Sequence, residues 1–265
     1  MSFSASGLHA RKFKTPRTII ALILREMVTT YGRSPGGYLW AILEPVGGLA
    51  VLTIAFSMAF HNPALGNSFP LFYATGYLPF MAYSDLAQKI GQSIRFSRPL
   101  LAYPSVTYTD AIIARFLLNT LTHLMVFFLI ISGIMLMSET RAVLDYGAIA
   151  NSFGMALTLG LGLGTLNCFL LMRFPIWERL WVILNRPLFL MSGVFFMYEF
   201  VPDPFGSYLW YNPLIHVVGE MRRGFYPTYS GDYISYVYAY GLGLIFLLMG
   251  NVLLGRYHRE LLSNW

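Results

Sequence analysis

Six long apolar stretches limit what this chain can fold into more than any other feature. They cover residues 38–60, 69–94, 111–137, 146–172, 180–201 and 233–254. A helix of roughly 20 apolar residues crosses a hydrocarbon core of about 30 Å, and backbone in lipid must satisfy its own polar groups. The pattern therefore predicts an all-α integral membrane protein with six transmembrane helices.

Charged residues are few, and their positions predict the orientation. They make up 11% of the 265 residues, which leaves little for a soluble domain, so we expect a single transmembrane domain over residues 1–265. The net charge of +6 does not indicate nucleic-acid binding, because the basic residues flank the apolar stretches. Most lie before the first span or after the second, fourth and sixth: Arg11, Lys12, Lys14, Arg17, Arg25, Arg33, Arg95, Arg98, Arg173, Arg179, Arg256 and Arg259. The positive-inside rule then puts both termini in the cytoplasm, and residues 1–15 lack the apolar core of a cleavable signal peptide.

Two further segments are helical without being long enough to span. Residues 15–31 start with Thr15 as a cap and Pro16 in the first turn, and a short apolar stripe with charges at both ends predicts a helix in the membrane interface. Residues 202–232 are rich in Pro, Gly and aromatic residues, with a short helix that starts at Asn212-Pro213 and ends at Gly224. We interpret them as an external re-entrant hairpin between spans five and six.

The chain offers no chemistry of its own. None of its three lysines follows a glycine, which excludes a phosphate-binding loop, and no metal site or catalytic constellation has the required spacing. The single cysteine, Cys168, excludes an intrachain disulfide. The glycines at 160, 162 and 164 lie inside a span and favour close helix packing over ligand binding. We expect a subunit that is not an enzyme and that holds no cofactor.

Ionisable residues inside membrane spans are energetically costly, so each one is first considered for a functional role. For Asp85 and Lys89, spaced i,i+4, a local ion pair is favoured over a proton relay. For Glu44, a structural role is favoured over a role in transport. Arg115 is expected to snorkel toward the cytoplasm. For His123, a neutral, hydrogen-bonded ring is favoured over a pH switch.

Aromatic and charged residues mark two places where a sugar polymer could pass. Aromatic side chains crowd the second span and the external end of the fifth, and a carbohydrate path and an interfacial aromatic belt explain them equally well. The residues we assign to this channel are Tyr77, Phe80, Tyr83, Tyr198, Trp210 and Tyr211. In the hairpin, Glu220 lies i,i+4 from His216 and i,i+3 from Arg223, so one carboxylate is expected to hold both.

Two segments resemble one family. The first is Arg25-Glu26, Tyr31-Gly32-Arg33-Ser34, Gly37-Tyr38-Leu39-Trp40-Ala41 and Glu44-Pro45; the second is Asn212-Pro213-Leu214, His216 and Glu220-Met221-Arg222-Arg223-Gly224-Phe225. In this order, and over nearly the whole chain, they resemble the permease subunit of ABC exporters for bacterial surface polysaccharides, especially group 2 capsule exporters. O-antigen and teichoic acid permeases are similar relatives.

The resemblance implies a homodimer in the bacterial inner membrane with two copies of a separate ATPase, which binds ATP and Mg. It implies contact with that ATPase through the interfacial helix and the loop over residues 95–110, where we place Arg25, Glu26, Arg33, Arg95, Arg98, Tyr103 and Pro104. The hairpin would form an external gate, with His216, Glu220, Arg222 and Arg223 in it. The implied substrate is a long acidic glycan on a lipid anchor with a sugar linker. Arg222 and Arg223 would suit its charge, and a purely anchoring role explains them equally well. Periplasmic and outer-membrane export proteins are implied partners.

Two other classes fit less well. A secondary transporter would show an inverted repeat and a proton-relay set, and neither is detectable. A membrane-embedded enzyme acting on glycans or lipids would need carboxylates or histidines at catalytic spacing, which the chain lacks.

Overall fold

The computed structural model describes residues 14–31, 37, 39–101, 106–137 and 144–263. The helices, in chain order, are α1 (Lys14–Tyr31), α2 (Leu39–Ala59), α3 (Phe69–Gly91), α4 (Ser93–Leu101), α5 (Tyr108–Met137), α6 (Tyr146–Arg173), α7 (Trp177–Leu190), the 3₁₀ turn η1 (Tyr198–Phe200), α8 (Phe205–Leu209), α9 (Pro213–Phe225) and α10 (Tyr236–Ser263). No β-strand occurs in these described ranges, so the all-α prediction is confirmed.

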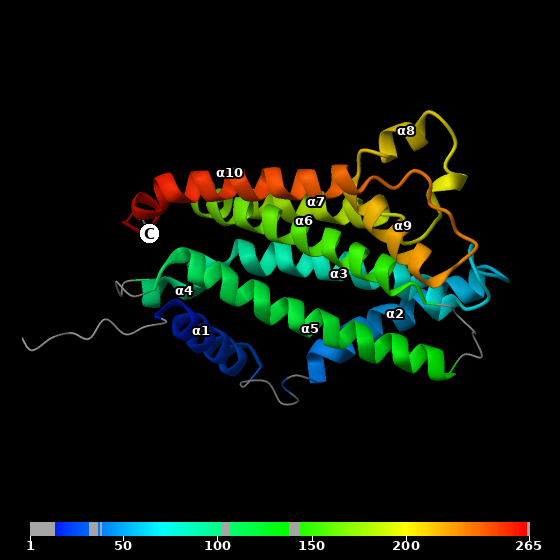
Figure 1. Ribbon diagram of the computed structural model, residues 1–265, viewed down its shortest axis with the longest axis horizontal. Coiled ribbons are helices and arrows are strands. Elements are labelled where there is room, and N and C mark those ends of the chain that lie inside the picture. Colours follow the sequence, from blue (N-terminus) through cyan, green and yellow to red (C-terminus); the bar gives the residue numbers. More distant parts are fainter. Residues whose placement is uncertain (1–13, 32–36, 38, 102–105, 138–143, 264–265) are drawn as a thin grey trace, which may run out of the picture.

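Helix α6 is the centre of the bundle, packed against both α3 and α10 (Figure 1). Glycines allow this close approach. A Cβ atom on Gly160 would lie 2.9 Å from the Cβ of Leu86 in α3, and one on Gly164 would lie 2.8 Å from the Cβ of Ile90. On the other side, a Cβ on Gly162 would collide with the carbonyl oxygen of Gly243 in α10. The predicted packing role of these glycines is therefore confirmed.

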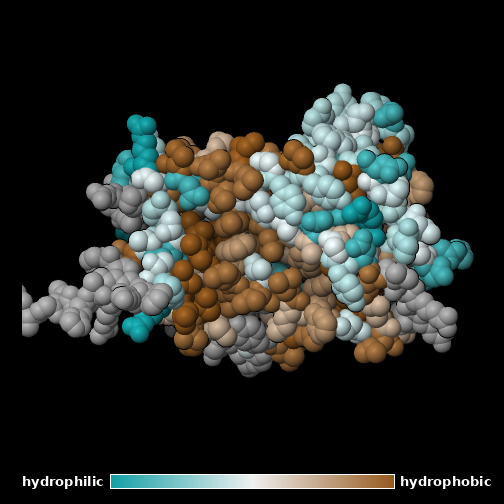
Figure 2. Space-filling view, in the orientation of Figure 1, coloured by the Kyte–Doolittle hydropathy of each residue, from teal (hydrophilic) through white to brown (hydrophobic). Residues whose placement is uncertain are grey.

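In the described part of the chain, four helices are long and apolar enough to cross a membrane: α2, α5, α6 and residues Tyr236–Tyr257 of α10. Large apolar side chains on α2, α5 and α10 face outward, such as Met58, Phe128 and Val252. They form a hydrophobic band between two polar ends of the molecule (Figure 2). Helix α3 has 23 residues but carries Asp85 and Lys89, and it lies outside this group of four.

The fifth predicted span is not one continuous helix. Helix α7 has 14 residues and ends at Leu190, and the chain then turns through Gly193, whose φ of +79° is readily adopted only by glycine. The prediction of a helix over 180–201 is therefore wrong in its second half. The second span also ends earlier than expected, because a separate helix, α4, starts at Ser93.

The local start signals act as the sequence predicts. The Asn212 side chain caps α9 by accepting a hydrogen bond from the Leu214 N–H at 3.1 Å, with Pro213 as the first helical residue. Helix α1 exposes Ile20, Leu24 and Val28 and buries Glu26 on another face. Helices α1 and α4 lie at the end of the bundle that holds the C-terminus, and α8 and α9 lie at the opposite end (Figure 1).

Candidate functional site

Helix α9 of the hairpin carries four charged or titratable side chains, and His216 is held by hydrogen bonds to backbone. Its Nδ1 accepts from the Ser235 N–H at 3.2 Å, so the ring hydrogen lies on Nε2, which donates to the Trp210 carbonyl at 2.9 Å. Burial lowers the pKa of His216, which favours this neutral form. The expectation that Glu220 holds His216 is wrong, because both ring nitrogens bond to the loops that flank the helix.

Glu220 links α9 to the start of α10. Its side chain is 0% exposed, accepts from Arg223 Nη2 at 2.8 Å and accepts from the Tyr236 hydroxyl at 3.0 Å. The predicted pair between Glu220 and Arg223 is therefore confirmed. Tyr236 is the partner that helical spacing did not reveal.

Arg222 and Arg223 point to different surroundings. The Arg222 residue is 2% exposed, and its guanidinium donates to the carbonyl oxygens of Phe196 at 2.8 Å and Val194 at 3.2 Å. It also lies 4.3 Å from the centre of the Phe72 ring. The Arg223 side chain is 37% exposed. In this conformation only Arg223 is accessible to an acidic glycan, so the structure does not support a substrate contact for Arg222.

Arg222 explains how the chain tolerates the break after α7. Non-helical backbone at membrane depth must find partners for its polar groups within the protein. The two carbonyls that Arg222 binds belong to the segment just after Gly193, where the helix has ended. A buried arginine on α9 thus anchors the irregular half of the fifth predicted span.

The predicted channel aromatics fall into two groups. In the bundle, Phe80 and Tyr83 are buried, and Phe80 packs 4.8 Å from Phe189 of α7, while Tyr77 lies 6.1 Å from the same ring. Phe80 and Tyr83 belong to the hydrophobic core of the bundle, and Tyr77 packs against it.

At the hairpin, Tyr198 packs 4.2 Å from Tyr233, and Trp210 stacks 5.1 Å from Tyr238. Tyr211 is exposed on the surface. The hairpin aromatics therefore join η1, the loop before α9 and the start of α10.

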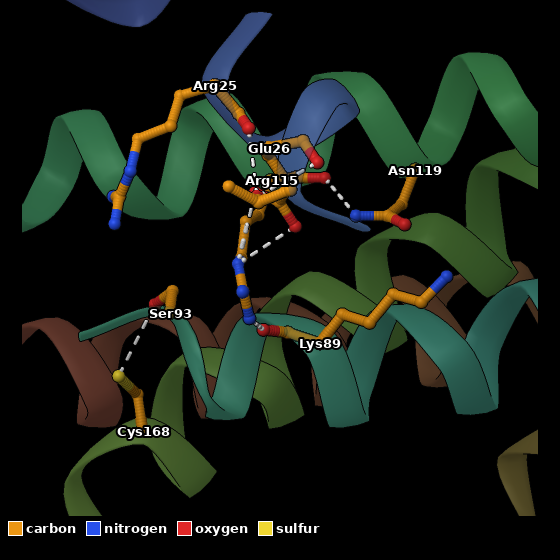
Figure 3. Close-up of polar contacts among 8 residues, drawn as sticks. Arg25, Glu26, Lys89, Ser93, Arg115, Asn119 and Cys168 are labelled. Atoms are coloured by element: carbon orange, nitrogen blue, oxygen red, sulfur yellow. Dashed lines mark hydrogen bonds and ion pairs between the residues drawn. The ribbon is translucent and has the colours of Figure 1, made fainter. Parts of the chain in front are cut away.

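At the opposite end, a buried ion pair joins α1 to α5 (Figure 3). Arg115 Nε lies 3.1 Å from Glu26 Oε1. The Nη1 atom of Arg115 donates to the carbonyl oxygen of Lys89 in α3. Burial raises the pKa of Glu26, and the Arg115 guanidinium opposes that shift. The Arg115 side chain is only 7% exposed, so its guanidinium is paired inside the protein and not presented to water, as snorkelling would require. Glu26 is likewise buried against its own chain rather than presented to a partner.

Phe96 of α4 completes this cluster. The guanidinium of Arg115 lies 4.4 Å from the centre of its ring and that of Arg25 lies 5.2 Å from it, both in range for cation–π attraction. Helices α1, α3, α4 and α5 therefore meet at one point. The partner of Glu26 lies 89 residues away in the sequence, so helical spacing could not reveal it.

The other coupling candidates differ in accessibility. Arg95 pairs with Glu178 of α7 at 3.0 Å and donates to the Leu171 carbonyl, and Arg98 is exposed on α4. Arg33, Tyr103 and Pro104 lie outside the described residues. Of the seven candidates, Arg98 is thus the described basic residue most open to a partner at this end.

Asp85 and Lys89 form the expected ion pair within α3, and His123 of α5 lies beside it. Lys89 Nζ lies 3.6 Å from Asp85 Oδ2, and His123 Nε2 of α5 lies 3.3 Å from the same oxygen. A cavity of about 230 Å³ beside them is also lined by Glu44. Among the described residues, no group of three or more His, Cys, Asp and Glu side chains is placed to hold a metal ion.

These features define an all-helical membrane protein with the charged helix α9 at one end and α1, held by a buried ion pair, at the other. No protein-family model matches the chain. It is 31% identical over 245 residues to the polysialic acid transport protein KpsM of Escherichia coli, which covers 92% of this chain and 93% of that protein. It is 25% identical over 244 residues to the capsule polysaccharide export inner-membrane protein CtrC of Neisseria meningitidis serogroup A, and 25% identical over 243 residues to BexB of Haemophilus influenzae, with 92% of each chain covered in both cases.

The chain therefore belongs to the family of capsule polysaccharide export inner-membrane proteins, and the resemblance seen in its sequence motifs is confirmed.

Proposed function

We propose that this chain is the transmembrane subunit of an ABC exporter that moves capsular polysaccharide across the inner membrane, with ATP hydrolysed by a separate subunit. The observation that carries the proposal is the 31% identity to a polysialic acid transport protein over 92% of this chain and 93% of that relative. A match of that extent covers nearly all of both sequences rather than one shared motif.

The topology in this proposal has six crossings and cytoplasmic termini. Helix α3 is the second crossing, and α7 with the irregular segment after it is the fifth. The end that holds α1, α4 and the C-terminus is cytoplasmic, because the basic residues of the sequence concentrate there. The hairpin of α8 and α9 is then external and re-entrant, which agrees with its short helices and its buried polar network.

Coupling to the ATPase would pass through α4. This short helix carries the exposed Arg98, and its Phe96 lies between Arg25 of α1 and Arg115 of α5. A movement of α4 caused by the ATPase would therefore displace α1 and α5 together. Glu26 has the role of holding α1 in this cluster rather than of touching the partner.

The working unit in this proposal is a homodimer with two ATPase subunits. The outward apolar faces of the bundle offer surface both to lipid and to a second copy. The substrate is a glycan on a lipid anchor, and Arg223 at the external end would meet its acidic groups. Periplasmic and outer-membrane export proteins would receive the product.

The test is deletion and complementation in the bacterium that carries this chain. We expect deletion to abolish surface polysaccharide while the polymer accumulates inside the cell, and the wild-type chain to restore export. Affinity purification of the chain should bring down an ATPase, and only the complex should hydrolyse ATP. Unchanged surface polysaccharide after deletion would exclude the proposal.

A further inference from the structure

A large groove runs between α7 and the paired helices α3 and α6. Its cavity has a volume of about 580 Å³, within the range of small-molecule sites. Four carboxamides line it: Gln88 from α3, Gln92 directly after that helix, Asn167 from α6 and Asn185 from α7. Trp181 lines it as well. None of these four carboxamides belongs to the hairpin or to the Glu26–Arg115 cluster.

In two of these side-chain amides, one of the two polar atoms has no hydrogen-bond partner among the described residues. Asn167 Oδ1 accepts from the Trp177 indole at 2.9 Å, and Asn185 Nδ2 donates to the Ser84 hydroxyl at 2.8 Å. Their other atoms, the Asn167 Nδ2 donor and the Asn185 Oδ1 acceptor, are buried and have no hydrogen-bond partner within the described part of the chain. Asn167 is itself 1% exposed. Because buried polar atoms are nearly always paired, an unused donor and an unused acceptor in one groove indicate a polar ligand.

The rest of the lining narrows the chemistry of that ligand. On α7, Trp181, Asn185 and Phe189 are spaced i,i+4 and so share one face of the helix, and all three line the groove. Two charged residues, Glu178 and Arg186, also line the groove. The Glu178 carboxylate is paired with Arg95 at 3.0 Å, and Arg186 is exposed at the groove, where it would suit an acidic group of the same ligand. Neutral amides beside aromatic rings suit a ligand that carries many hydroxyls, because each hydroxyl both donates and accepts, while apolar ring faces pack on aromatics.

The geometry points to this groove as a binding site for hydroxyl-rich sugar units of the exported glycan, on the cytoplasmic side of the hairpin gate. The inference rests on the proposed function and extends it. The sugar hydroxyls would pair with the free donor of Asn167 and the free acceptor of Asn185, and the Trp181 ring would support a sugar face. An alternative occupant is a second copy of this chain packed along α7, and the experiment separates the two.

The test uses the full complex purified with its ATPase and a fluorescently labelled oligosaccharide cut from the host's own capsular polysaccharide. Binding is measured by fluorescence anisotropy for wild type, Asn185→Leu and Gln88→Leu. Loss of one or two hydrogen bonds should weaken binding about tenfold. Gln88 lies on the exposed edge of the groove, so Gln88→Leu is expected to fold even if Asn185→Leu does not. The matched control is Asn151→Leu, an exposed asparagine on α6 outside the groove, which should bind as wild type does.

The outcomes distinguish failure of the inference from failure of the proposed function. If wild type restores export and binds the oligosaccharide while both groove variants bind it equally well, the groove is not the sugar site. If the variants change the oligomeric state of the complex in size-exclusion chromatography and leave sugar affinity unchanged, the groove is an interface between copies, and the inference is overturned. If wild type itself does not restore export, the proposed function fails.

Discussion

Replacing Arg222 with methionine tests whether this buried residue supports the break after α7. Methionine has similar length but no donor, so the carbonyls of Val194 and Phe196 lose their partners. A buried carbonyl left unpaired costs about 1–3 kcal/mol, or about 2–6 kcal/mol for the two. Loss of attraction to the Phe72 ring adds to this, while removal of a buried charge offsets part of it. We therefore expect a net loss of about 2–4 kcal/mol.

The assay is thermal unfolding of the detergent-purified chain, followed by the fraction that stays monodisperse after heating. For a chain of this size each kcal/mol lowers the midpoint by about 2–4 °C, so a loss of about 2–4 kcal/mol in Arg222→Met should lower it by roughly 4–16 °C. Arg222→Lys keeps the charge but lacks the planar fork that reaches two carbonyls, and its midpoint should fall between those of Arg222→Met and wild type.

An exposed arginine elsewhere in the chain is the matched control. Arg98 is exposed on α4, so Arg98→Met should lower the midpoint much less than Arg222→Met. Equal midpoints for the two methionine variants would refute the assignment of Arg222 as the support for the irregular segment.

Three further predictions concern the hairpin, the α1 cluster and the topology. Glu220→Ala removes the buried acceptor and should reduce export or make the channel leak small ions, while Glu220→Gln keeps an acceptor and should have a smaller effect. If both variants show the surface polysaccharide and ion leak of wild type, this carboxylate is dispensable. Glu26→Gln leaves the Arg115 charge buried without its carboxylate and should destabilise the chain by about 3–5 kcal/mol in thermal unfolding. The double variant Glu26→Gln/Arg115→Met should be more stable than Glu26→Gln alone, and stability losses that simply add would argue against a coupled pair. In intact cells, a membrane-impermeant maleimide should label a cysteine at the exposed Asn62 but not one at the exposed Phe174, and the reverse pattern would invert the proposed orientation.

The labelling site at Phe174 shows why burial must be known first. Ser97 is an obvious choice from the sequence, since it lies between two basic residues after the second span. In the structure Ser97 is buried in α4. A cysteine there would escape labelling on either side of the membrane and would report nothing about orientation.

The sequence alone determined the features that depend on neighbouring residues. Asn212 and Pro213 predict the start of α9 because capping and a fixed φ act within one turn. The small residues Gly160 and Gly164 predict close packing because helix backbones can approach only where side chains are absent. The length and apolarity of the spans likewise predict an all-helical membrane protein, since a continuous apolar segment of roughly 20 residues satisfies its own backbone polar groups in lipid as a helix.

Only the tertiary structure decided which side chains face the interior and which distant groups they meet. Arg222 and Arg223 are adjacent, yet successive residues on a helix point about 100° apart, so the direction of the core decides that one is buried and the other accessible. The Glu26–Arg115 pair joins residues 89 positions apart, and no local pattern encodes such a contact. The break after α7 was hidden for the same reason: residues 191–201 read as a continuing apolar helix until Arg222, from a helix later in the chain, is seen to satisfy the carbonyls that the break leaves open.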